Sequence, residues 1–226
     1  MMAVALQKED ECRSREVARY TAAVCRLCRR SGEKLMLKGS RCLTPKCALD
    51  RRASPPGRQP TRQRQSRMSD RGFQLREKQK ARYSYGIMER QFRRAFTHAA
   101  KQSGITAENL LVLLERRLDN VVYRLGFADS RAQARQIVQH GHIMLSGHKT
   151  DIPSCLVKEG DTIGWKESST KSEYYRQVAE NIEAKLVPGW LSLDKEKLVG
   201  QVSSLPTPDD VEAKFEGKAV VEYYSR

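Results

Sequence analysis

Four of the chain's six cysteines lie within one short segment, CRLCRRSGEKLMLKGSRCLTPKC. Two residues separate Cys25 from Cys28, and four separate Cys42 from Cys47. Where thiols stay reduced, two close pairs of cysteines are typical of a metal site, because four thiolates give Zn²⁺ its tetrahedral shell. The spacing therefore predicts a zinc site formed by these four residues.

Such a site would be structural rather than catalytic, because four protein ligands leave no coordination position open. The segment is too short to form a hydrophobic core, so the metal would supply most of its folding free energy, roughly 10–16 kcal/mol in zinc modules. An iron-sulfur cluster is the alternative, since four thiolates also hold one. We favour zinc because the surroundings are rich in Arg and Lys.

The N-terminus does not resemble a targeting signal. Its apolar run is only about five or six residues long, and Glu9, Asp10, Glu11 and Glu16 follow it, whereas transit peptides avoid acidic residues. No stretch approaches the roughly 20 apolar residues that span a bilayer. We expect a cytoplasmic protein with reduced cysteines and no membrane partner.

The charge of the chain points to a polyanionic partner. It has 42 basic and 27 acidic residues, a net charge of +15. Residues 51–94 contain 14 basic and 3 acidic residues, whereas residues 181–226 contain 6 and 8. Within the first of these regions, 54–67 has three prolines, four arginines and no aliphatic or aromatic side chain, so it should run extended. A solvated charged face is the alternative, but this density of arginine favours binding to nucleic acid.

The elements that would position these residues begin with helices. Residues 73–102 are predicted to be helical, with a break near Gly86 and an apolar face at helical spacing. That face consists of Met88, Phe92, Ala95 and Ala99.

Two further helices are predicted downstream. One runs from Thr106, as N-cap, to Gly126, with Leu110, Leu114, Leu118, Val121 and Leu125 on one face. The other runs from Ser130, which would form a capping box with Gln133, to Gly141.

After Gly141 the pattern becomes that of short strands. HIMLSGHKTDI reads as a strand, a Ser-Gly turn and a strand, and DIPSCLVKEGDTIGWKE adds a third. A helix at about 171–185 precedes two further predicted strands, KLVGQVSSLP and KAVVEYYSR. The prediction is an α+β fold with a four-cysteine zinc knuckle, a helical domain, and an RNA-binding helix pair with a small antiparallel sheet.

The helix pair carries the candidate RNA contacts. Arg131 and Arg135 share one face with Gln139, and His140 and His142 flank the glycine that ends the helix. Such a shape can dock on an RNA backbone rather than read base edges. A metal or acid-base role for the histidines is disfavoured because no carboxylate or cysteine is spaced to complete a site.

Sequence motifs of enzymes are missing. The chain has no GxxxxGK[ST], GxGxxG or GxSxG motif, and Cys12 and Cys155 are isolated. We therefore expect no catalytic residue, no enzymatic activity and no small-molecule substrate.

The longest motifs resemble those of one known family. ARYTAAVCRLCRRSGEKLMLKGSRC, RRASPPGRQ, GFQLREKQKARYSYGIMERQFRRAF, ENLLVLLERRLDNVVYRLGF, SRAQARQIVQHGHI, DIPSCLVKEGD and VVEYYSR are similar to the bacterial-type small-subunit ribosomal protein S4 family, in its four-cysteine, zinc-binding version. The resemblance covers roughly 17–226. It implies a structural rRNA-binding protein that binds a multi-helix junction, nucleates assembly of the subunit body and supports translational accuracy. It also implies ribosomal protein neighbours on the side where mRNA enters.

The resemblance also implies a division of the chain. Residues 17–50 would form the zinc knuckle, 51–113 the basic extended segment and helical domain, 114–180 the RNA-binding domain, and 181–226 a C-terminal segment that completes the fold. Residues 1–16 have no counterpart in the family; we expect them to be disordered and absent from the mature protein.

The predicted RNA-binding residues come from two sources. Motif positions of the family supply Arg90, Arg93, Arg94, Arg116, Arg117, Arg131 and Arg135, and the basic region and helix pair add Arg51, Arg52, Arg58, Arg62, Arg64, Arg82, Gln139, His140 and His142.

The turn LSGHKTD departs from the Asn-Gly turn of the family pattern, which weakens a backbone contact at Ser146 and His148. Cys155 likewise occupies a position where an aromatic residue is common.

Two other functions compete with the ribosomal one. RNA-modifying enzymes carry the same helix-pair module, but they need a separate catalytic domain, which the residues before 114 do not supply. A zinc-dependent DNA-binding regulator would need a recognition helix after its metal module, and none follows the cysteines.

Overall fold

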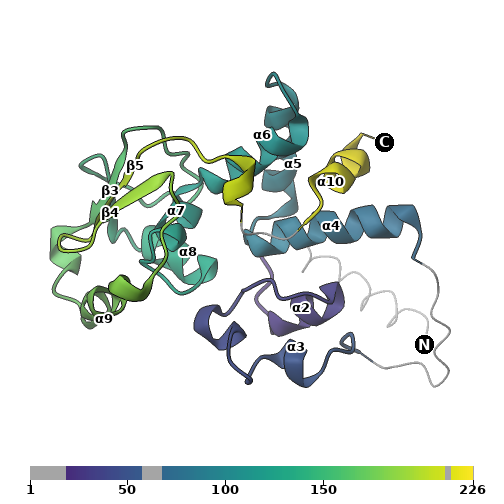
Figure 1. Ribbon diagram of the computed structural model, residues 1–226, viewed down its shortest axis with the longest axis horizontal. Coiled ribbons are helices and arrows are strands. Elements are labelled where there is room, and N and C mark those ends of the chain that lie inside the picture. The colour runs from purple at the N-terminus through teal and green to yellow at the C-terminus, as the bar shows by residue number, and fades with distance from the viewer. Residues whose placement is uncertain (1–18, 58–67, 212–214, 226) are drawn as a thin grey trace, which may run out of the picture.

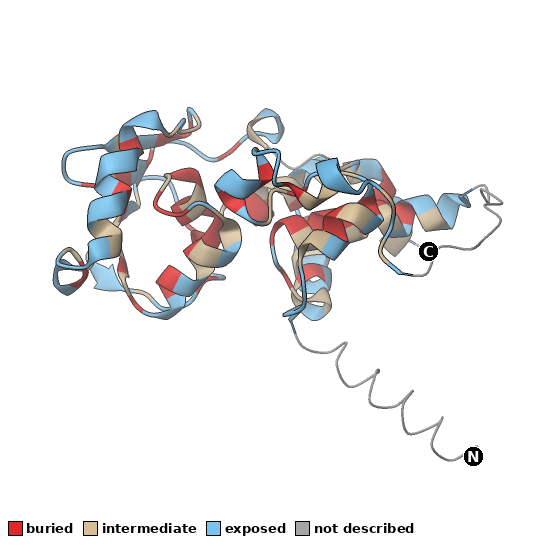
Figure 2. Ribbon diagram, turned by 90° about the horizontal axis from the view of Figure 1, so that it is seen from below, coloured by how far each residue is buried: buried red, intermediate tan, exposed pale blue. Residues whose placement is uncertain are grey.

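The computed structural model describes residues 19–57, 68–211 and 215–225. They form a cysteine segment (residues 25–51), a helical domain and a sheet domain (Figure 1). Buried residues gather in the interiors of the helical and sheet domains (Figure 2). No helix in the described ranges is long and apolar enough to cross a bilayer. Residues 1–16, predicted to be disordered, lie outside these ranges.

The cysteine segment has little regular structure. It consists of helix α2 (Cys25–Ser31), the 3-10 turn η1 (Gly39–Cys42) and the short helix α3 (Ala48–Arg51). Its small apolar cluster contains Leu27, Cys28 and Leu35, packed against Tyr83 of helix α4. Two polar contacts to α4 reinforce this packing: Arg76 donates to the carbonyl of Ser31, and Lys80 pairs with Glu33 at 2.6 Å.

The helical domain consists of α4 (Asp70–Ser84), α5 (Glu89–Ala100), α6 (Thr106–Glu115) and the C-terminal helix α10 (Gly217–Tyr224). The predicted apolar face of α5 is confirmed, since Phe92 and Ala99 are fully buried in the core of this domain. The predicted break is confirmed as well: Gly86 has φ +61°, a conformation that ends α4 and lets the chain turn into α5.

The C-terminal strand predicted for KAVVEYYSR is wrong, because these residues form α10. Ala219 and Val220 are buried against α4, and Tyr224 stacks on Phe96 with ring centroids 4.7 Å apart. The β-branched and aromatic residues favour a strand only locally, because packing against α4 and α6 buries them more than a free sheet edge would.

The sheet domain joins α7 (Leu118–Arg124) and α8 (Arg131–Gln139) to an antiparallel sheet and to α9 (Glu173–Asn181). The strand order is β2-β1-β3-β5-β4, with bounds β1 (Ile143–Leu145), β2 (His148–Lys149), β3 (Thr162–Trp165), β4 (Leu191–Asp194) and β5 (Val199–Val202). One core lies between the helices and this sheet. Gly200 of β5 approaches Leu125 so closely that a Cβ there would lie 2.5 Å from it.

The predicted hairpin, third strand and β5 are confirmed, and β4 was missed. The β1–β2 turn places Ser146 and Gly147 at φ +48° and +82°, so the Ser-Gly pair adopts the turn geometry for which the family pattern uses Asn-Gly. The C-terminal residues serve both domains, because β4 and β5 extend the sheet and α10 completes the helical core.

The single helix predicted from Thr106 to Gly126 is wrong, because it is divided into α6 and α7. Arg117 has ψ 136° and forms an isolated antiparallel bridge with Leu156, while Leu118 donates to the carbonyl of Cys155 at 2.8 Å. A distant loop thus competes for the backbone of Arg117, which local periodicity cannot reveal. The apolar face itself is confirmed on both sides of the break.

The helix starts were predicted with mixed success. Ile105, not Thr106, is the N-cap of α6. Ser130 caps α8 by accepting from the backbone of Gln133 at 3.3 Å. The side chain of Gln133 accepts from the backbone N–H of Asp129 instead of Ser130, so the capping box is incomplete.

Candidate nucleic-acid interface

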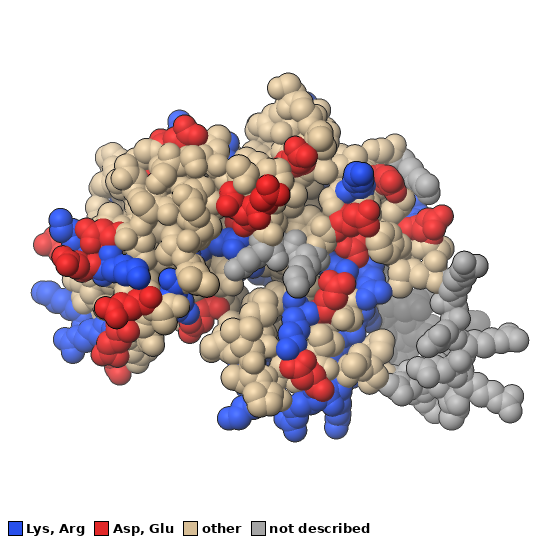
Figure 3. All heavy atoms as spheres, viewed as in Figure 1, with Lys and Arg blue, Asp and Glu red and all other residues tan. Residues whose placement is uncertain are grey.

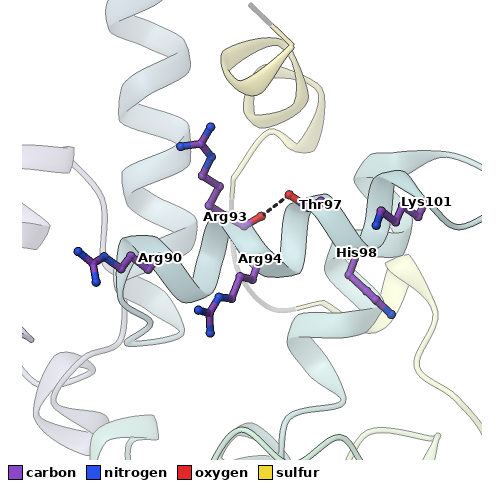
Figure 4. Close-up of a pocket in the computed structure, with 6 residues that line it drawn as sticks. All are labelled: Arg90, Arg93, Arg94, Thr97, His98 and Lys101. Atoms are coloured by element: carbon purple, nitrogen blue, oxygen red, sulfur yellow. Dashed lines mark hydrogen bonds between the residues drawn. The ribbon is translucent and has the colours of Figure 1, made fainter.

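Helix α5 presents a row of exposed basic side chains, which we call the α5 face. They border an open cavity of about 490 Å³ and fan out along the helix (Figure 4). The lining residues are Arg90, Arg93, Arg94, Thr97, His98 and Lys101, all of them exposed. Within the described residues, the side chains of the three arginines and Lys101 form no hydrogen bond or ion pair. Their charge is therefore available to a polyanion.

The sequence predicted only part of this face. Arg90, Arg93 and Arg94 were predicted, whereas Thr97, His98 and Lys101 were missed. The signal was available, because residues three and four apart share one side of a helix, and these three continue the arginines at that spacing.

Several other arginines that were predicted to bind RNA form ion pairs or hydrogen bonds inside the protein. Arg117 is buried, and its guanidinium donates to both carboxylate oxygens of Asp119, at 3.1 and 2.8 Å. Arg135 pairs with the same carboxylate at 2.9 Å. Burial lowers the pKa of Arg135, and the charge of Asp119 opposes that shift. Asp119 thus fixes two arginines that the motif positions had suggested for RNA.

Arg82 and Arg116 also have internal contacts. Arg82 lies over the ring of Tyr83, 4.7 Å from its centroid, and 3.6 Å from Glu89. Arg116 donates from Nε to the carbonyl of Val157 at 3.0 Å, which helps to hold the strand-like loop beside the break between α6 and α7.

Arg131 occupies the boundary between the helical and sheet domains. Its Nε donates to Oδ1 of Asn120 at 2.7 Å. The guanidinium lies 5.0 Å from the ring centroid of Tyr85 and 4.6 Å from that of Tyr123. Its orientation is therefore set by residues from both domains.

The C-terminal end of α8 forms a second, smaller exposed surface. Gln139 and His140 are exposed there, as is Lys149 of the neighbouring hairpin. His142 is half-buried, with Nδ1 2.9 Å from Oγ of Ser169, and its ring lies 6.0 Å from that of His140. We call Gln139, His140 and Lys149 the α8 surface.

The four cysteines predicted as metal ligands are neighbours in space. Cys28, Cys42 and Cys47 are buried, and Cys25 is half-buried. Burial raises the pKa of the Cys28 thiol, and the three other cysteines add to this increase. Cys42 also accepts a hydrogen bond on Sγ from the backbone N–H of Lys38 at 3.4 Å.

Across the described residues, no group of three or more His, Cys, Asp or Glu side chains is arranged to hold a metal ion. The zinc knuckle therefore stays a prediction.

The cysteine segment nevertheless presents positive charge. Lys and Arg gather over α2 and α3 on the face shown in Figure 3. The exposed basic residues of this stretch are Arg26, Arg30, Lys34, Lys38, Arg41, Lys46, Arg51 and Arg52. Of these, Lys34 pairs with Asp50, and the half-buried Arg29 donates to the carbonyl of Ser54. The predicted contacts Arg58, Arg62 and Arg64 lie outside the described residues.

Comparison with known proteins identifies both parts of the chain. Residues 19–115 match the ribosomal protein S4/S9 N-terminal domain, and residues 116–163 match the S4 domain. The boundary between the two matches coincides with the break between α6 and α7.

Relatives extend the similarity over nearly the whole chain. The small ribosomal subunit protein uS4 of Dehalococcoides mccartyi (strain CBDB1) is 59% identical, and that of Halothermothrix orenii (strain H 168) is 54% identical. The small ribosomal subunit protein uS4A of Alkaliphilus oremlandii (strain OhILAs) is 53% identical. Each alignment spans 210 residues, 93% of this chain and the full length of the relative. The chain therefore belongs to the ribosomal protein S4 (uS4) family.

Proposed function

We propose that this protein is a structural, rRNA-binding constituent of the small ribosomal subunit, bound to ribosomes in the cytoplasm. The observation that carries the proposal is the α5 face, whose three arginines and one lysine have no internal partner in the described part of the chain. Cations exposed in this way fit a phosphate backbone. The family supports the same function, since the relatives are small-subunit proteins along their full length.

The arrangement of the basic surfaces supports a more specific role, binding to a multi-helix junction of rRNA. The cysteine segment, the α5 face and the α8 surface lie on three different parts of the fold. A multi-helix junction of rRNA offers several backbones to such a protein, and binding there would nucleate assembly of the subunit body. The same proposal includes contacts with ribosomal proteins on the side where mRNA enters. It also includes support of translational accuracy.

Footprinting on total RNA tests the proposal directly. We expect protection of one junction in small-subunit rRNA, and an affinity that falls with salt at a log–log slope of about −0.7 to −0.9 per phosphate contacted. Protection spread over tRNA, or a shallow slope, would contradict it. An RNA-modifying enzyme would instead leave altered nucleotides; the family to which the chain belongs is structural rather than enzymatic.

We further propose that the four cysteines bind Zn²⁺, which would draw the neighbouring thiols into one tetrahedral shell. Their closeness in space supports this proposal. Four thiolates on Zn²⁺ carry a net negative charge, and the many Lys and Arg residues of the segment would offset it.

Metal analysis of the purified protein tests the zinc proposal. We expect stoichiometric zinc by mass spectrometry, its loss in Cys42→Ser, and retention in the matched variant Cys155→Ser. Chelation should weaken RNA binding while both domain cores stay folded, because neither core includes the metal. Visible absorption from iron in the purified protein would favour a cluster instead.

A further inference from the structure

A buried polar cluster joins the helical domain to the sheet domain. Its centre is Glu115, the last residue of α6, whose side chain is completely buried. The carboxylate accepts hydrogen bonds from Tyr85 at 2.5 Å, from Asn120 at 2.7 Å, and from Arg124 at 3.0 and 3.1 Å. Tyr85 and Glu115 belong to the helical domain, whereas Asn120 and Arg124 belong to α7 of the sheet domain.

The cluster crosses the domain boundary a second time. Asn120 accepts from Arg131 of α8 on the amide oxygen while its amide nitrogen donates to Glu115. The guanidinium of Arg131 lies between the rings of Tyr85, from the helical domain, and Tyr123, from the sheet domain. Arg124 adds a third link by donating to the carbonyl of Asp210, on the segment that leads to α10.

These contacts lie where the chain passes from the helical domain into the sheet domain. Helix α6 ends at Glu115 and α7 begins at Leu118, so no continuous helix holds the domains at a fixed angle. Buried hydrogen bonds to charged groups are directional and costly to leave unmade. The cluster therefore fixes an angle that the chain itself would leave free.

That angle matters for RNA because the exposed basic surfaces lie on opposite sides of the joint. The α5 face belongs to the helical domain, and the α8 surface belongs to the sheet domain. A rigid protein that engages two RNA backbones at once gains the second contact without losing further conformational entropy.

We propose that Tyr85 and Asn120 are positioning residues for rRNA binding, which act through Glu115 and Arg131 to hold the α5 face at a fixed angle to the sheet domain. This inference rests on the proposed function. Tyr85 is 3% exposed and Asn120 is 1% exposed, so neither side chain reaches RNA. Burial and the charge of Glu115 raise the pKa of Tyr85 well above its usual value, which keeps its hydroxyl a donor.

The test compares the binding of full-length protein to two RNAs: a transcript of small-subunit rRNA, and a short uniform duplex that reaches only one surface. Tyr85→Phe removes only the hydroxyl, and Asn120→Ala removes the link between Glu115 and Arg131. We expect each variant to bind the transcript about tenfold or more weakly, because bivalent binding is lost, while duplex affinity stays within about twofold. Small-angle scattering should show a broader distribution of shapes.

Two control variants carry the same kinds of substitution at other positions. Tyr83→Phe makes the same change two residues earlier, and Asn181→Ala removes an exposed amide of α9; both should bind the transcript like wild type. Should Asn120→Ala fail to fold by circular dichroism, Tyr85→Phe decides the matter alone. Unchanged transcript affinity in folded Tyr85→Phe, or equal loss on both RNAs, would overturn the inference. Failure of the proposed function looks different, since wild type itself would then not prefer the transcript.

Discussion

At the scale of single residues, the fold depends on how buried charges are paired. Glu115 and Asp119 lie four residues apart, and both carboxylates are paired. Glu115 accepts from the side chains of Tyr85, Asn120 and Arg124. Asp119 accepts from the side chains of Arg117 and Arg135 and from the backbone N–H of Asn120. A buried carboxylate without such partners would cost several kcal/mol. The same pairing removes Arg117 and Arg135 from the exposed charge, so it determines both stability and which cations remain for RNA.

Loss of the Glu115 carboxylate should therefore be severe. We expect Glu115→Ala to lower the free energy of unfolding by about 3–5 kcal/mol, because it removes the buried carboxylate that pairs with Arg124 and accepts from Tyr85 and Asn120. Urea denaturation measures the change. Glu108→Ala, at an exposed position of the same helix, should shift it by less than about 0.5 kcal/mol. Similar effects of the two substitutions would show that the buried network contributes little.

At the scale of elements, α5 has two functions on its two sides. Its apolar side closes the core of the helical domain through Phe92 and Ala99, and its polar side forms the α5 face. A helix anchored so firmly can hold flexible cationic side chains at a constant spacing. The element therefore converts a local sequence pattern into an exposed cationic surface.

Charge removal on α5 should weaken RNA binding without loss of stability. We expect Arg94→Ala, and separately Lys101→Ala, to reduce the salt-dependence slope by about one phosphate contact. Filter binding over a range of salt concentrations measures this slope, and thermal melting should not change. Lys197→Ala, at an exposed position beside β5, is the matched control. A slope equal to that of the wild type in both α5 variants would exclude these side chains from the interface.

At the scale of the whole molecule, the cysteine segment also contacts the sheet domain. Gly39 approaches the turn before α8 so closely that a Cβ on it would lie 2.3 Å from the carbonyl oxygen of Asp129. Asp129 in turn pairs with Lys185 at 2.7 Å. All three parts of the chain therefore meet near α7 and α8.

An added methyl group at this contact should undock the cysteine segment. We expect Gly39→Ala to increase hydrogen exchange of the backbone amides in residues 25–51, while exchange in both domain cores stays slow. Gly86→Ala is the matched control, because Gly86 has a similar positive φ but no atom within 4 Å of the added Cβ. Equal exchange in the two variants would mean that backbone strain, rather than the lost contact, is responsible.

The sequence by itself determined the properties that depend on local pattern. Helical spacing predicted the apolar sides of α5 to α8, and the Ser-Gly pair predicted the β1–β2 turn. The density of arginine predicted a polyanionic partner. Close cysteine spacing likewise predicted that the four thiols would be neighbours. These features follow from residues a few positions apart, whose geometry is fixed by the helix or strand period.

Only the tertiary structure decided what depends on distant partners. The bridge to Leu156 ends the helix at Arg117, and packing against α4 favours a helix in a segment with strand propensity. Asp119 determines which arginines are hidden. From sequence, Arg94 and Arg135 look alike, yet one is exposed and the other holds the fold together. The physical reason is that burial and pairing are properties of the assembled fold, and they override local preference wherever they carry more free energy.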